Sequence, residues 1–151
     1  ASTVPLEAIR LMFSHHMSMP KPNLSNHPDD DDVIVILDIS RAHPHAFPSR
    51  DLYTKLPPEH PSYNLEGVCG LLKMNLYGAK DAGKNFEALV FDISTKAGSK
   101  RGKANSCIYH NPKTEMSHLH YGDDFILKGK RKFCREFEAH LSKTLIVVGS
   151  L

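Results

Sequence analysis

The sequence lacks an apolar run long enough to cross a membrane. A membrane helix needs about 18 apolar residues, and the longest candidate stretch, Val33 to Leu37, ends at Asp38. No basic segment followed by an apolar one opens the chain, as a secretory signal would. Cysteine is scarce, with three residues and no CxxC pair, which fits a reducing compartment, the cytoplasm or the nucleus, and core or near-core thiols. We therefore expect no membrane partner.

The chain also has little net charge, but that charge is unevenly distributed. The formal net charge is +2. Residues 1–95 carry 8 basic and 12 acidic side chains, whereas residues 96–135 carry 10 basic and 3 acidic ones. Such a basic segment fits a phosphate-rich partner, and a solubilising surface is the alternative interpretation.

What is present suits one folded domain, because 151 residues with 40 % hydrophobic and 24 % charged side chains can form a core. Apolar periodicity, caps and turn residues predict three helices, over residues 5–17, 79–96 and 130–143. Strands are expected over residues 33–37, 52–56, 68–74, 107–110, 117–121, 125–128 and 145–148. Residues 98–105 are expected to form a basic loop.

The strand 33–37 is apolar and β-branched throughout, which predicts burial on both faces. With the shortest elements set aside, the order from there is β-α-β-β-α-β. This is the split β-α-β pattern of an α+β, ferredoxin-like fold, an antiparallel sheet with helices on one face. Its first and third strands are central neighbours, which brings Asp38 close to Asp123 and Asp124 at the predicted Gly122–Asp123 hairpin.

Two further groups of polar residues stand out. The four carboxylates of Asp29–Asp32 repel one another, which favours a solvated loop tip, and Arg131, Lys132 and Arg135 are expected to form a solvated helix face. His118 and His120 share one face of a strand and, together with His43-Pro44-His45, are candidate zinc ligands. The alternative is that these histidines occupy former apolar or aromatic positions.

Three converging carboxylates cannot all remain ionised unless a cation lies between them. Oxygen ligands suit Mg²⁺ or Mn²⁺, and two such ions can hold the attacking and leaving oxygens of a phosphoryl transfer. An Asp-Asp pair preceded two places earlier by Tyr arises by chance roughly 0.02 times in a chain of this composition. Tyr121-Gly122-Asp123-Asp124 is therefore a moderately specific signal.

Five segments in order resemble the reverse transcriptase (RNA-directed DNA polymerase) of copia-type retrotransposons. Tyr121-Gly122-Asp123-Asp124 is similar to the YxDD hairpin of that family, and Leu37-Asp38-Ile39-Ser40 is similar to the segment with its first catalytic aspartate. The remaining three are Leu52-Tyr53-Thr54-Lys55-Leu56-Pro57-Pro58, Leu76-Tyr77-Gly78-Ala79-Lys80 and Phe125-Ile126-Leu127-Lys128-Gly129.

The resemblance implies a polymerase palm over residues 33–151, preceded by a helix and acidic loop over residues 1–32 as a remnant of fingers or linker. It implies a nucleotidyltransferase with two Mg²⁺ or Mn²⁺ ions held by Asp38, Asp123 and Asp124. Its implied partners are a template-primer of RNA or DNA, a deoxynucleoside triphosphate, and the integrase and RNase H of the same polyprotein. The residues implied to contact nucleotide or template are Ile39 (through its carbonyl), His43, Tyr77, Gly78, Lys80, Tyr121 and Gly122.

The chain departs from the family pattern at several positions. His43 stands where reverse transcriptases have an aromatic residue that stacks under the sugar, and His118 and His120 stand in a normally apolar strand. Most of the fingers, the thumb and RNase H are expected to be missing. The alternative to an active enzyme is a catalytically decayed palm that serves only as a nucleic-acid-binding or interaction module. A histidine-rich metal-binding domain is the third hypothesis.

Overall fold

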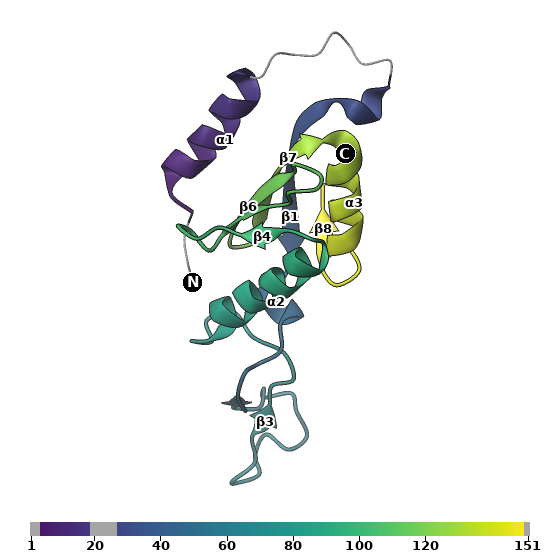
Figure 1. The fold of residues 1–151 in the computed structure, drawn as a ribbon. Coiled ribbons are helices and arrows are strands. Elements are labelled where there is room, and N and C mark those ends of the chain that lie inside the picture. The colour runs from purple at the N-terminus through teal and green to yellow at the C-terminus, as the bar shows by residue number, and fades with distance from the viewer. Residues whose placement is uncertain (1–3, 19–26, 150–151) are drawn as a thin grey trace.

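The computed structural model describes residues 4–18 and 27–149, which form an α+β fold (Figure 1). Three helices are present in this part of the chain, α1 (Leu6–Ser18), α2 (Ala82–Lys96) and α3 (Arg131–Leu141). The longer strands are β1 (Asp32–Ser40), β6 (Ser117–Tyr121) and β7 (Asp124–Lys130). The short elements are the 3₁₀ turns η1 (Pro28–Asp30) and η2 (His43–His45) and the strands β2 (Tyr53–Thr54), β3 (Gly70–Leu71), β4 (Lys100–Arg101), β5 (Ile108–His110) and β8 (Ile146–Val148).

Six of the strands form one sheet in the order β4-β5-β6-β7-β1-β8, in which every neighbouring pair is antiparallel. The α+β class and the antiparallel sheet agree with the sequence-based expectation. β1 and β7 are central neighbours, as predicted, and are paired from Asp32 opposite Lys130 to Asp38 opposite Asp124. The β6–β7 hairpin also forms at Gly122–Asp123 as predicted.

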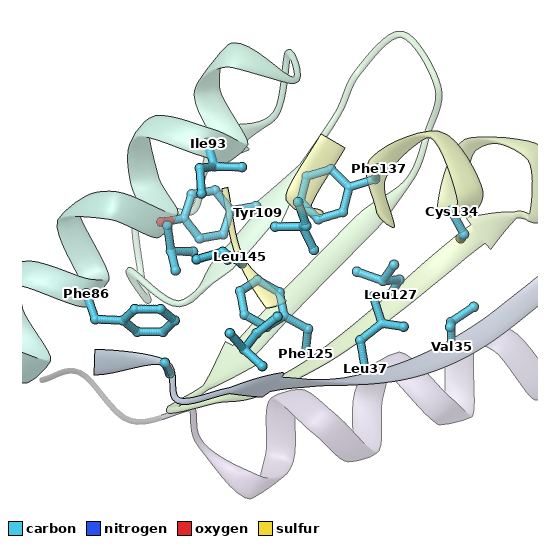
Figure 2. Close-up of a cluster of buried hydrophobic side chains, with 14 of the residues drawn as sticks. Val35, Leu37, Phe86, Ile93, Tyr109, Phe125, Leu127, Cys134, Phe137 and Leu145 are labelled. Carbon is cyan, nitrogen blue, oxygen red and sulfur yellow. The ribbon is translucent and has the colours of Figure 1, made fainter. Parts of the chain in front are cut away.

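The main core lies between the sheet and helices α2 and α3 (Figure 2). Its helical residues recur at helical spacing, so each helix turns one apolar face to the sheet. These residues are Phe86, Val90 and Ile93 on α2, and Cys134, Phe137 and Leu141 on α3. Opposite them, β1 contributes Val35, Leu37 and Ile39, and β7 contributes Phe125 and Leu127.

The other face of the sheet is only partly covered, by helix α1 (Figure 2). A small cluster joins Val4, Cys107 and Leu119 to partly buried residues of α1, β5 and β7, and no residue of α1 is itself buried. Beyond this cluster the face is open, and the side chain of Ile36 is 62 % exposed. The prediction that strand 33–37 is buried on both faces is therefore wrong, because only one face of β1 is fully covered.

Four other expectations need correction. Helix α2 begins at Ala82 rather than at residue 79, because Gly78, with a φ of +87°, and the turn after it precede the first helical residue. The basic loop 98–105 contains a strand, β4, which pairs with β5. Cys69 is exposed, whereas Cys107 and Cys134 are buried. Asp29 and Asp30 pair with α3 instead of forming a free loop tip; residues 19–26 of the predicted loop lie outside the described residues.

Residues 47–77 form a lobe around the small β2–β3 sheet, which projects away from the main sheet at the bottom of Figure 1. Many of its large apolar side chains are exposed, among them Phe47, Tyr53, Leu65 and Met74. In the described part of the chain, no helix combines the length and the apolar character that crossing a membrane requires.

Candidate active site

The Gly122–Asp123 turn brings the first strand and the hairpin together at one end of the sheet. Asp38 lies directly opposite Asp124, and the Ile39 N–H donates a hydrogen bond to the carbonyl oxygen of Asp123 at 2.9 Å. Gly122 has a φ of +62°, and glycine at the first of two turn positions is typical of a type II′ hairpin. The backbone of Asp123 is thus tied both to the hairpin and to β1.

The side chains at this end of the sheet point to the open face. Directly opposite residues of an antiparallel pair share a face, and successive residues alternate. Since Leu37, Ile39 and Phe125 point into the helix-covered core, Asp38 and Asp124 point the other way. Tyr121 lies opposite Asp124 on β6 and is 54 % exposed. One row across the open face therefore carries a phenol and two carboxylates.

Within residues 4–18 and 27–149, no salt bridge involves Asp38, Asp123 or Asp124. In the same residues, no three His, Cys, Asp or Glu side chains gather into a group that could hold a metal ion. The structure thus pairs two carboxylates, Asp38 and Asp124, and holds the third, Asp123, through its backbone.

Two exposed carboxylates on neighbouring strands fit a hard divalent cation. Mg²⁺ is usually held by one or two carboxylates, with waters and substrate phosphate oxygens completing its shell. A cation between Asp38 and Asp124 also removes the cost of placing two like charges opposite each other. The convergence of all three carboxylates on two ions stays a prediction.

The remaining candidate residues form a second group, between β1 and α2. The His43 ring lies on η2, five residues after Asp38, and packs against Tyr77 at 4.7 Å and Phe86 at 6.2 Å between ring centroids. Tyr77, Gly78 and Lys80 are all exposed in the turn that leads into α2. The positive φ of Gly78 lets that turn reverse without a side-chain clash.

Asn75 is a residue of this second group that the sequence analysis missed. Its side chain is 1 % exposed. Its amide nitrogen donates hydrogen bonds to the carbonyl oxygens of Ala46 (3.0 Å) and Phe47 (3.2 Å), and its Oδ1 accepts one from the Asn85 side chain at 3.2 Å. Asn75 therefore joins the segment after η2 to the start of α2. The available signal was an amide between two apolar residues, Met74 and Leu76, where burial requires hydrogen-bond partners.

The histidines on β6 belong to the core and not to the candidate site. His118 is fully buried, has its Nε2 3.0 Å from Ser94 Oγ, and stacks on Tyr109 with a centroid distance of 4.8 Å. His120 packs on Phe125. Burial lowers the pKa of His118 to about 3 and that of His120 to about 4, so both are neutral at physiological pH.

The zinc alternative gains no support from these positions. His118 and His120 face the helix-covered core, while His43 and His45 lie on η2, where His45 Nε2 is 3.0 Å from the carbonyl oxygen of Ser40. No group of potential ligands of the size zinc requires occurs in the described residues. Aromatic and imidazole contacts account for the environment of His118 and His120.

Comparison with protein-family models, with curated proteins and with solved structures finds no significant match to this chain.

Proposed function

We propose that this chain is the palm region of a copia-type reverse transcriptase and catalyses nucleotidyl transfer at Asp38, Asp123 and Asp124. The observation that carries the proposal is the register of β1 and β7, which sets Asp38 opposite Asp124 on the open face of the sheet. The order of the five similar sequence segments supports it independently.

In this proposal each residue of the row has a separate task. Asp38 and Asp124 would hold two divalent cations, of which one would lower the pKa of the attacking hydroxyl and the other would neutralise charge on the leaving pyrophosphate. Asp123 adds a third carboxylate from the hairpin, and Tyr121 positions the end of the primer. The hydrogen bond from Ile39 to Asp123 keeps the hairpin in register with β1, so that the carboxylates do not drift apart.

The second group supplies the nucleotide side of the proposed site. His43 faces the sugar of the incoming deoxynucleoside triphosphate, and Gly78 and Lys80 contact the nucleotide or the template. The packing of His43 against Tyr77 restricts the imidazole to one region of the site. Imidazole is smaller than the aromatic ring that the family has there, and this difference favours the second candidate, a palm that binds nucleic acid without turning over.

Primer extension on an RNA template, with Mg²⁺ or Mn²⁺, tests the proposal. We expect extension by the unaltered chain, and its loss in the Asp38→Asn and Asp123→Asn variants. Asp92→Asn is the matched control, because Asp92 is exposed on α2, away from the hairpin. Equal activity of Asp123→Asn and Asp92→Asn would disprove the catalytic role. Salt-dependent RNA binding without extension would identify the non-catalytic palm instead.

A further inference from the structure

Basic side chains at the start of α3 form ion pairs with acidic side chains that precede β1. Lys132 Nζ lies 2.8 Å from Asp30 Oδ1, and an Arg135 guanidinium nitrogen lies 2.8 Å from Asp29 Oδ1. The hydrogen bond and charge of Lys132 lower the pKa of Asp30, and Asp30 in turn raises the pKa of Lys132. Both partners are therefore charged at physiological pH.

The backbone of the same segment binds two more cationic residues. Lys130 Nζ donates to the carbonyl oxygen of Asp30 at 3.1 Å, and Arg131 Nε donates to that of Pro28 at 3.2 Å. The Arg131 N–H also donates to the carbonyl oxygen of Asp31 at 2.9 Å. We refer to Lys130, Arg131, Lys132 and Arg135 as the basic cluster, and to residues 28–31 as the acidic segment.

The basic cluster is remote from the aspartate row. Asp32 pairs with Lys130 at one end of β1, and Asp38 pairs with Asp124 at the other end. Six residues of extended strand separate these two positions, which corresponds to about 20 Å. Helix α3 also packs on the core side of the sheet, whereas the aspartates point to the open side. A ligand of the basic cluster would therefore not occupy the candidate active site.

The ion pairs between the two segments are exposed and can be exchanged. The four side chains of the two salt bridges are between 41 % and 51 % exposed. Exposed pairs of this kind are weak and are screened by salt. Oxygen anions in contact with lysine and arginine side chains reproduce the contacts that phosphate groups make. The acidic segment thus makes contacts with the basic cluster that a polyanion would also make, but it binds the cluster weakly.

We infer that the basic cluster is a contact surface for a nucleic-acid backbone, and that the acidic segment is its intramolecular competitor. A nucleic acid offers phosphates at regular spacing, so one strand can engage several of these cations at once and release counterions as it binds. The uneven charge of the chain agrees with this partner, because the cluster lies at the end of the segment 96–135, which contains 10 basic and 3 acidic side chains.

The test is binding of a fluorescent single-stranded oligouridylate, followed by anisotropy at low and at physiological salt. We expect Asp29→Asn/Asp30→Asn to bind it about tenfold more tightly than the unaltered chain at low salt, with a steeper salt dependence. Glu59→Gln/Glu66→Gln is the matched control, because it removes the same charge from exposed positions of the lobe. Adding Lys132→Gln/Arg135→Gln to the Asp29/Asp30 variant should abolish the gain.

Equal tightening by the two charge-matched variants would overturn the inference, because net charge alone would then explain it. Unchanged binding in the Asp29/Asp30 variant would also overturn it, as would equal displacement of the oligonucleotide by polyglutamate and by unlabelled RNA. Asp29→Asn alone replaces the double variant if the latter does not fold, since Asp29 contacts only the exposed end of Arg135 among the ion pairs described. Primer extension by the unaltered chain does not depend on the Asp29/Asp30 variant, so failure here is distinguished from failure of the proposed catalysis.

Discussion

The same strands form both faces of the six-stranded sheet, but the two faces differ in how far they are buried and in the charged groups that they carry. Along β1, Val35, Leu37 and Ile39 are buried under α2 and α3, while Ile36 and Asp38 between them are exposed. The two sets alternate because successive side chains of a strand point to opposite faces. A single strand therefore contributes to a dry core and to a charged, solvent-accessible surface at the same time.

Polar side chains on the two faces have different environments. On the helix-covered face, His118 and His120 are kept neutral by burial, and Ser94 is the hydrogen-bond partner of His118. On the open face, Asp38 and Asp124 face each other with solvent beside them. Desolvation penalises charge on the first face, whereas water or a bound cation can stabilise it on the second. This difference is the physical reason why the proposed metal site lies on the open face.

Truncating one apolar side chain on each face gives the largest effect that we expect from a single substitution. Leu37→Ala removes a fully buried side chain and should lower the free energy of unfolding by about 3 kcal/mol. Ile36→Ala, at the adjacent exposed position, should change it by less than about 1 kcal/mol. Urea denaturation followed by circular dichroism measures both. Equal losses would show that the open face is covered in solution.

We expect acid to destabilise the fold through the two histidines that are buried on the helix-covered face. Both β6 histidines have a folded-state pKa, about 3 and about 4, below the ordinary value of 6.5. Between about pH 6.5 and pH 4, the unfolded chain binds more protons at these histidines than the folded one does. The free energy of unfolding therefore falls as the pH drops from about 6.5 toward 4. The expected slope is about 1.4 kcal/mol per pH unit for each histidine.

The control for this pH dependence is His120→Phe. His120 packs on Phe125, and neither of its ring nitrogens has a hydrogen-bond partner in the described residues. Phenylalanine cannot bind a proton, so the slope between pH 6.5 and pH 4 should fall by about half relative to the unaltered chain. An unchanged slope would mean that His120 already titrates normally in the folded protein.

A glycine substitution in the hairpin on the open face should have only a small effect on stability. Alanine at Gly122 would meet no atom within 4 Å, so its cost is the strain of a positive φ, about 1 kcal/mol. Gly67 in the lobe also has a positive φ, of +78°, and the same free space, so Gly67→Ala should have a similar cost. If the hairpin positions the aspartates, only Gly122→Ala should also reduce primer extension. Equal primer extension by the two variants would show that the conformation of the turn does not affect the activity.

Local patterns were sufficient to predict most of the fold. The β-branched run in β1, the helical spacing of apolar residues in α2 and the Gly122–Asp123 turn each predicted the element that is found there, and the element order predicted β1 and β7 as neighbours. Element ends were less predictable, because they depend on how the chain enters an element. For α2, the turn at Gly78 delays the first helical residue to Ala82.

Positions that depend on contacts distant in sequence could not be predicted. The pairing of Asp29 with Arg135 joins residues more than one hundred positions apart. The hydrogen bonds of Asn75 to the segment after η2 also depend on how the lobe returns to α2. Neither interaction leaves a periodic signal along the chain, because each requires two elements to be packed before the partners meet.

The sequence by itself determined most of the elements and the placement of Asp38 and Asp123-Asp124 near strand ends. Only the tertiary structure decided which face each strand turns to the core. Helices α2 and α3 carry apolar stripes wide enough to cover one side of the sheet, and α1 covers only part of the other. Burial of apolar area on the first side therefore left Asp38, Asp124 and Tyr121 together on the second, where their polar groups remain hydrated.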